Sequence, residues 1–281
     1  MTILVPTDFS DRASHALGLA CQIASRQQAG IRLLHVLEHP QGVLLNASGD
    51  INLEKPTSNP FIVDLIKSAN ESMDHMAKSC QSVDIIKDVH IGKPNTDLAD
   101  NLVNAPADLI IMSYKGKGEP ETIGKIPEKV IRMANCPVIT IKSPTALDDL
   151  KTIVYGSNLS EKEKPVIEKL KAFQQWLQAE ILVLKVFTTS NLHPVSSDWE
   201  AIREFIKQNE IDNCQPYFNP APSEEEGIVK FAREHKADMI AVGTHGRKGL
   251  ARLFSGSIAE GLSHHARLPV WTCNLKAGGS A

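Results

Sequence analysis

Short apolar runs alternate along the chain with longer amphipathic stretches. Ile3–Val5 and Ile31–Val36 are apolar runs of strand length, and such runs are typical of buried strands. Between them, Ser10 can cap a helix, and the predicted buried face of that helix carries Ala13, Leu17, Ala20, Cys21 and Ala24. The alternation continues along the chain and predicts a regular succession of strands and helices.

The predicted elements form two similar series. The first series has strands at Ile3–Val5, Ile31–Val36, Val83–Val89, Leu109–Ser113 and Val138–Lys142, and further helices at Phe61–Ser79, Asn95–Val103 and Pro127–Ala134. The second has strands at Ile153–Tyr155, Ile181–Phe187, Gln215–Asn219, Met239–Gly243 and Val270–Asn274, and helices at Pro165–Ala179, Trp199–Asn209, Glu224–His235 and Gly256–His265. Pro165 lies five residues after Ser160, the next candidate cap, so the helix there is expected to begin late.

An internal repeat supports this division. The segment 108–113 (DLIIMS) resembles 238–243 (DMIAVG), and 136–141 (CPVITI) resembles 268–273 (LPVWTC). A repeat of this length predicts two copies of one domain, at residues 1–144 and 149–281. Strands alternating with helices predict an α/β fold: two doubly wound domains, each a five-stranded parallel sheet with helices on both faces. Ligands of such sheets bind at the carboxyl ends of strands, so the loops after the first and fourth strands of each copy are the places to search.

Composition excludes several classes of protein. The chain is 42% hydrophobic and 22% charged with a net charge of −3, which is typical of a globular protein and gives no basic field for nucleic acid. We expect no membrane partner, because no apolar run approaches the roughly 18 residues of a membrane span. The five cysteines are widely spaced and odd in number. We therefore expect reduced, packed thiols and a cytoplasmic location, since the first residues also lack the pattern of a signal peptide.

One loop carries the strongest chemical signal. Gly243, Gly246, Gly256 and Ser257 lie between a predicted strand and a predicted helix. Glycines allow a close approach of the backbone to a ligand, and a helix N-terminus favours anions. Positive charge is added along the loop by Arg247, Lys248 and Arg252. The pattern indicates a phosphate site, although a flexible loop before a Ser-capped helix would show the same two features.

The spacing Gly-x2-Gly-x9-Gly-Ser resembles the ATP-binding signature of the universal stress protein family. The segment 5–10 (VPTDFS) is similar to that family's opening strand and loop, and the whole chain resembles a tandem universal stress protein. The resemblance implies a stress-response protein that binds ATP, with or without Mg²⁺, in its second copy. The nucleotide-binding residues implied are Gly156, Ser157, Asn158, Val186, Val242, Gly243, His245, Gly246, Arg247, Gly256, Ser257 and Ile258. His245 either contacts phosphate or sugar, or remains a solvated loop residue.

The two copies depart from the family pattern in opposite ways. Asp8 is present in the first copy, but Ser113 and Lys125 replace a loop glycine and the final serine, and Glu119 in that loop would repel phosphate. The second copy keeps its glycine loop but has Asn158 where the family usually has an aspartate. We therefore expect nucleotide in the second copy and little or none in the first.

Three functions remain open from the sequence. The first is a nucleotide-dependent binding or signalling module, with no residue assigned to catalysis or to a metal. The second is a slow Mg²⁺-dependent ATPase, and the third is a nucleotide-free interaction protein with another ligand in its first copy. The resemblance also implies that the last strands of the two copies, Val138–Lys142 and Val270–Asn274, pair with each other. A homodimer of tandem chains is the expected assembly.

Overall fold

The computed structural model describes residues 1–38, 60–80, 83–92, 99–104, 106–115, 125–188, 195–244 and 268–274. The N-terminal half consists of β1 (Thr2–Pro6), α1 (Asp11–Gln27), β2 (Gly30–Glu38), α2 (Pro60–Ala77), β3 (Ile85–Gly92), α3 (Ala99–Asn104), β4 (Leu109–Ser113), α4 (Lys125–Met133) and β5 (Val138–Ile141). A 3₁₀ turn at Leu147–Asp149 follows. The alternation of strand and helix is the predicted one.

The C-terminal half repeats this series. It consists of β6 (Thr152–Gly156), a 3₁₀ turn at Glu161–Glu163, α5 (Lys164–Leu177), β7 (Glu180–Phe187), α6 (Ser196–Gln208), β8 (Cys214–Pro220), α7 (Glu224–Glu234), β9 (Met239–Thr244) and β10 (Val270–Asn274). The late helix start is confirmed, because Pro165 occupies the first turn of α5, where its missing N–H costs nothing. The predicted helix Gly256–His265 lies outside the described residues.

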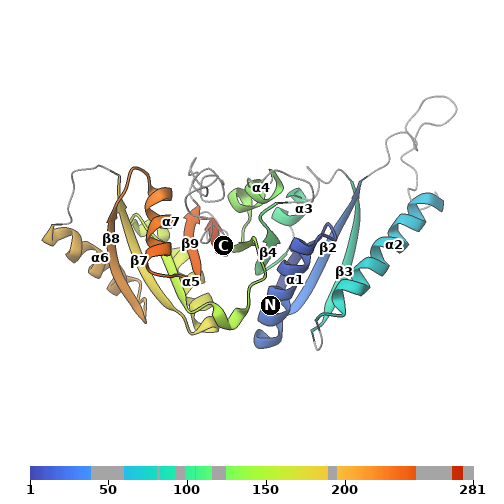
Figure 1. The fold of residues 1–281 in the computed structure, drawn as a ribbon, viewed down its shortest axis with the longest axis horizontal. Coiled ribbons are helices and arrows are strands. Elements are labelled where there is room, and N and C mark those ends of the chain that lie inside the picture. The colour runs from blue at the N-terminus through green and yellow to red at the C-terminus, as the bar shows by residue number, and fades with distance from the viewer. Residues whose placement is uncertain are drawn as a thin grey trace, which may run out of the picture.

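The strands of the described residues form one sheet in the order β3-β2-β1-β4-β5-β10-β9-β6-β7-β8 (Figure 1). Within each half every strand pair is parallel. The strand order reverses between β1 and β4 in the N-terminal half and between β6 and β9 in the C-terminal half. Each reversal is a topological switch point, where an α/β sheet opens a crevice for ligands.

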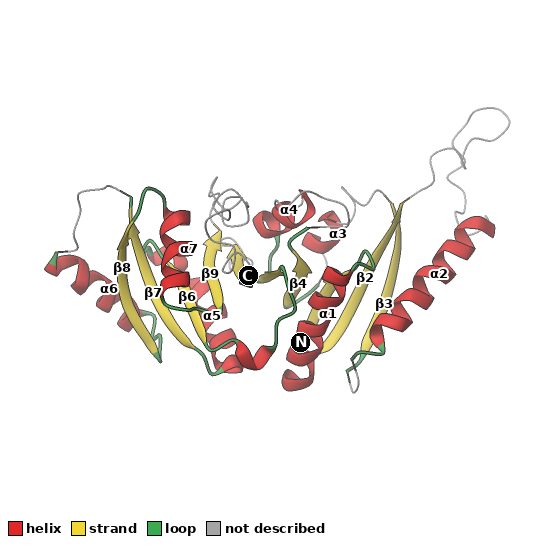
Figure 2. Cartoon of the chain, in the orientation of Figure 1, coloured by secondary structure: helices red, strands yellow, loops and turns green. Residues whose placement is uncertain are grey.

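Helices cover both faces of the sheet, as predicted (Figure 2). Successive strand residues point to opposite faces, so Ile3 and Val5 join one core cluster while Leu4 joins the other. The first cluster includes residues of α1, α2, α5 and α6, and the second includes residues of α3, α4 and α7. Ser10 accepts a hydrogen bond from the Ala13 N–H at 3.2 Å, which confirms the predicted cap of α1.

The last strands of the two halves pair across the middle of the sheet, which confirms that expectation. β10 runs antiparallel to β5, with Trp271 opposite Ile139. Trp271 is fully buried. The Thr272 hydroxyl also donates to the Val138 carbonyl at 3.2 Å. The two halves therefore share one sheet and, on each of its faces, one continuous core.

The expectation of five unpaired thiols is wrong for two of them. Cys21 and Cys80 form a disulfide, with their Cα atoms 5.4 Å apart. Their separation of 59 residues gave no sign of this, because only the folding of α2 beside α1 brings them together. Cys136, Cys214 and Cys273 are free, and burial raises the pKa of the Cys136 thiol to about 12 and that of Cys273 to about 11. Among the described helices, none combines the length and the apolar character that crossing a membrane requires.

Candidate functional site

The candidate site lies at the switch point of the C-terminal half. The last residue of β6, Gly156, is opposite Val242 on β9, so the loops after both strands begin side by side. Six of the predicted site residues are described, namely Gly156, Ser157, Asn158, Val186, Val242 and Gly243. The other six, His245, Gly246, Arg247, Gly256, Ser257 and Ile258, lie outside the described residues.

The first-strand loop of this half is held by its own polar groups. The Ser157 hydroxyl donates to Glu163 at 2.6 Å and accepts from the Leu159 N–H at 2.9 Å. Asn158 Oδ1 accepts from the Ser160 N–H at 2.9 Å. The Ser160 N–H can only donate, so the amide atom that it contacts is the oxygen, Oδ1. As far as the described residues show, the amide nitrogen, Nδ2, is then the atom that can donate to a ligand. Asn158 therefore offers a donor, which suits a phosphate or ribose oxygen.

Glu163 is a buried carboxylate beneath this loop. Its side chain accepts from the Tyr155 hydroxyl at 2.8 Å and, on the same oxygen, from Ser157. The other oxygen accepts from the Asn158 backbone N–H at 3.1 Å. A buried charge is tolerated only when hydrogen bonds replace water, and at 2% exposure Glu163 meets that condition with three donors. Glu163 therefore holds the loop in place from the interior side.

The N-terminal half has a loop of the same shape. Phe9 and Leu159 have matching left-handed φ angles of 59° and 63°. Asp8 Oδ1 accepts from the Ser10 N–H at 3.0 Å, just as Asn158 accepts from Ser160. Because both side chains close the same turn, the exchange of aspartate for asparagine alters charge and donor character without altering the loop.

The residue that contacts the first-strand loop from the neighbouring strand also differs between the two halves. In the C-terminal half, Lys185 Nζ on β7 donates to the Asn158 carbonyl at 3.1 Å. At the matching position on β2, His35 Nδ1 lies 2.8 Å from the Thr7 carbonyl, and its ring contacts Phe9 at 4.3 Å between centroids. Burial lowers the pKa of His35, so this imidazole is neutral at pH 7. The first-strand loop thus carries an amide and an ammonium in one half, but a carboxylate and a neutral ring in the other.

Packing explains two small residues near the site. A Cβ at Gly156 would lie 2.5 Å from Ile228 Cδ1 of α7, so this glycine is needed for the helix to approach the sheet. Val186 is buried, and its two methyl groups would lie 2.6 and 2.9 Å from a Cβ at Gly227. The Val186 side chain therefore packs on α7, which leaves its backbone as the part that a ligand could meet.

The N-terminal half differs again at the end of β4. Ser113 stands where the other half has Gly243, and its hydroxyl donates to the Lys115 carbonyl at 2.9 Å. Lys115 is 2% exposed, and its Nζ lies 5.5 Å from the centre of the Tyr114 ring. The predicted glycines and glutamates that follow in this half lie outside the described residues.

Glu163 and Lys185 escaped the sequence analysis. Ser160 and Glu163 do show the S-x-x-E spacing of a helix start, and that signal could have marked Glu163. Its side chain, however, bonds Asn158 and not Ser160, which the spacing does not reveal. Lys185 carries no local signal, because its contact depends on β7 pairing with β6.

Comparisons with known proteins bear on the whole chain. A sequence profile described as the universal stress protein family matches residues 1–142 and 221–274. A universal stress protein of Methanocaldococcus jannaschii is 31% identical over 147 residues, which is 50% of this chain and 82% of that protein. Similarity in sequence is therefore found in both halves, while residues 143–220 retain the fold without matching the profile.

Solved structures are similar over nearly the full length. A universal stress protein from Archaeoglobus fulgidus has a TM-score of 0.69 at 18% identity, covering 97% of this chain and 96% of that one. This likeness supports the fold of two similar α/β halves. A universal stress protein crystallised in complex with cAMP covers 50% of this chain and 95% of its own, at 20% identity and a TM-score of 0.36.

Proposed function

This chain belongs to the universal stress protein family, and on that premise we propose that its C-terminal half binds ATP as a nucleotide-dependent binding module. At least one member of the family binds a nucleotide. The nucleotide would sit at the switch point between β6 and β9. The Asn158 loop would meet one side, and the segment from Gly243 to Ser257 would hold ribose and phosphates through backbone N–H groups.

One observation carries this assignment: the two first-strand loops share a backbone but differ in charge. In the C-terminal half the loop presents the Asn158 amide beside the Lys185 ammonium, and the Glu163 carboxylate is buried beneath the loop. In the N-terminal half the loop presents Asp8 beside the neutral His35. The Lys185 ammonium attracts a triphosphate, whereas the neutral His35 at the matching position adds no such attraction.

The first test identifies the ligand. Acid extraction of the purified full-length chain, followed by mass measurement, is expected to release an adenine nucleotide. Calorimetry then measures ATP affinity in two matched variants. Gly246→Val is expected to weaken ATP binding about tenfold or more, roughly 1.4 kcal/mol, because a β-branched side chain obstructs the close approach of backbone to phosphate. Gly116→Val, in the degraded loop, is expected to change affinity little, and equal losses in the two variants would contradict the assignment.

A second test isolates the charge of Lys185. Lys185→Met keeps most of the apolar stem but removes the ammonium, so ATP affinity is expected to fall about threefold to tenfold. Adenosine, which has no phosphate, is expected to bind the variant and the unmodified protein alike. If adenosine loses as much affinity as ATP, Lys185 acts by holding the Asn158 loop and the electrostatic argument fails.

A further inference from the structure

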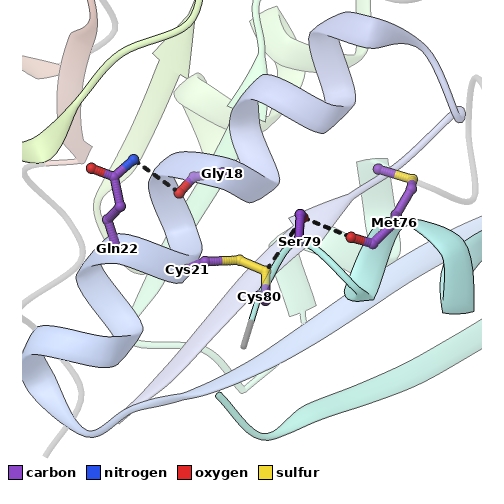
Figure 3. The surroundings of a disulfide bond; sticks show 6 residues. All are labelled: Gly18, Cys21, Gln22, Met76, Ser79 and Cys80. Carbon is purple, nitrogen blue, oxygen red and sulfur yellow. Dashed lines mark hydrogen bonds between the residues drawn. A yellow bond between two sulfur atoms is a disulfide. The ribbon is translucent and has the colours of Figure 1, made fainter. Parts of the chain in front are cut away.

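The Cys21–Cys80 disulfide joins two helices of the N-terminal half. Cys21 lies in the middle of α1 and Cys80 lies three residues beyond the end of α2 (Figure 3). The two residues are only 8% and 7% exposed. Both belong to the same core cluster as Met73 of α2, so the bond fixes the end of α2 against α1 within the hydrophobic core.

The same end of α2 also holds the first-strand loop. The Thr7 hydroxyl donates to Met76 Sδ at 3.3 Å, and Met76 lies one turn before Cys80. Thr7 directly precedes Asp8, and its hydroxyl accepts from the Phe9 N–H at 3.0 Å. A displacement of the end of α2 would therefore reach the loop at the switch point of the N-terminal half.

The C-terminal half makes the equivalent connection without a covalent bond. Gln28 and Gln178 end α1 and α5 with the same left-handed conformation, and Cys21 and Lys171 each lie seven residues earlier. Lys171 Nζ donates to the Asn209 carbonyl at 2.9 Å and lies 4.0 Å from Glu210, just past the end of α6. A cavity of about 320 Å³ opens beside this contact. The two halves therefore connect matching pairs of helices differently: α1 and α2 by a disulfide, α5 and α6 by a hydrogen bond and an ion pair.

We propose that Cys21 and Cys80 are a reversible thiol–disulfide exchange site that controls how firmly α2 holds the first-strand loop of the N-terminal half. The reducing partner is a dithiol. When the end of α2 opens locally and exposes the bond, one thiolate of the partner attacks a sulfur of the pair, forming a mixed disulfide and releasing the other cysteine as a thiolate. The second thiol of the partner then displaces the bound cysteine. Two electrons and two protons pass to the cysteines, and the partner leaves as a disulfide. An oxidised low-molecular-weight thiol reverses the exchange.

The fold restricts the effect to one half. Once reduced, Cys80 is held only by noncovalent packing, so local opening of α2 becomes less costly. The matching helices α5 and α6 have no disulfide among the described residues and do not respond to a reductant. The C-terminal site is thereby separated from the redox state of the N-terminal half, and the inference does not depend on nucleotide binding.

The test uses the full-length chain prepared without reductant. Alkylation in urea and peptide mapping, before and after treatment with dithiothreitol, are expected to show two additional reactive thiols, at Cys21 and Cys80. Hydrogen–deuterium exchange is then measured in both states. Residues 60–80 and 7–10 are expected to exchange about tenfold faster after reduction, while 164–177 and 196–208 keep their rates. Oxidised glutathione is expected to restore the slow exchange.

Two variants complete the test. Cys21→Ser is expected to show fast exchange in 60–80 with or without dithiothreitol, whereas Cys214→Ser, which removes a free thiol, keeps the full response. The proposal is overturned if the number of reactive thiols is the same before and after reduction. It is equally overturned if exchange in 60–80 of the unmodified chain is insensitive to dithiothreitol.

Discussion

Glu163 is the residue on which the first-strand loop of the C-terminal half depends most directly. Its carboxylate collects two side-chain hydroxyls and one backbone N–H in a place almost without water. Removing such an acceptor leaves the donors buried and unsatisfied, which costs more than the hydrogen bonds themselves contribute. The loop geometry at the candidate site is therefore supported by a residue that no ligand needs to touch.

We expect Glu163→Ala to lower the free energy of unfolding by about 3 kcal/mol, because Tyr155, Ser157 and the Asn158 N–H lose their acceptor together. The measurement is urea unfolding of the full-length chain. Glu161→Ala, in the same 3₁₀ turn but exposed, is the matched control and should stay within about 0.5 kcal/mol. A loss below that value for Glu163→Ala would show that the buried carboxylate contributes little.

Asn158 and Asp8 differ at one side-chain atom, and that atom determines what each side chain can bind. Each closes the loop by accepting a backbone N–H through Oδ1, so the loop has no preference between them. The remaining atom is an amide nitrogen in one and a carboxylate oxygen in the other. Only the carboxylate can help to hold Mg²⁺ or its waters.

Asn158→Asp is therefore expected to leave ATP affinity similar and to increase Mg²⁺-dependent hydrolysis, if hydrolysis changes at all. A triphosphate needs Mg²⁺ to neutralise the charge that develops on the leaving group, whereas binding substrate and transition state equally does not raise turnover. Phosphate release is measured for both proteins with and without Mg²⁺. Turnover near 1 per second in the unmodified chain, within the usual range of enzymes, would favour an ATPase over a binding module.

At the scale of elements, a glycine in α7 and a glycine in α1 have different surroundings. Gly227 lies in the first half of α7, where a Cβ would meet both methyl groups of Val186 and, at 3.0 Å, the Cβ of Ala221. Gly18 lies within α1, and a Cβ there would meet nothing within 4 Å. The first glycine lets a helix approach the sheet beside the candidate site, whereas packing does not require the second.

This contrast predicts opposite effects of one substitution. Gly18→Ala is expected to stabilise the chain by about 0.5–1 kcal/mol, because alanine loses less backbone freedom than glycine in a helix. Gly227→Ala is expected to destabilise it by about 1–3 kcal/mol, because overpacking pushes Val186 and α7 apart. Urea midpoints of the two variants decide the matter, and a stabilised Gly227→Ala would refute the close approach of α7.

At the scale of the whole molecule, the middle of the sheet joins the halves. β5 and β10 are apolar strands that would be exposed edges in either half alone, and exposed edges invite pairing with other chains. Within the described residues their pairing leaves β3 and β8 at the ends of the sheet. β8 carries Pro216 and Pro220, which lack the N–H that a further strand would require. Any association of two chains would need a surface other than β5 and β10.

We expect residues 1–144 and 149–281, expressed separately, to form homodimers or to aggregate, because each would expose its last strand and the buried face around it. Sedimentation measures their size. Mixing the two segments should restore a complex of one copy of each, with the mass of the full chain. Monomeric and well-behaved segments would contradict a shared core.

The order of helices and strands was predictable because its signals are local. Leu109–Ser113 and Val270–Asn274 are apolar runs whose observed bounds equal the predicted ones. The bounds of β3 were predicted less accurately, because each of its residues is half-buried or exposed, and the predicted range, Val83–Val89, is displaced toward the N-terminus. The glycine loop was marked by spacing alone, and its ligand remains a prediction.

The sequence by itself determined the doubling of the domain and the alternation of its elements, because burial periodicity and repeat spacing are properties of neighbouring residues. It also indicated that β5 and β10 pair, through the resemblance to a family. Only the tertiary structure decided that Cys21 meets Cys80, that Glu163 supports the Asn158 loop from below, and that Lys185 lies beside it. Each of these contacts depends on how close separate elements come, or on which of several nearby donors a side chain reaches. Such distances are set by packing and hydrogen bonding in three dimensions.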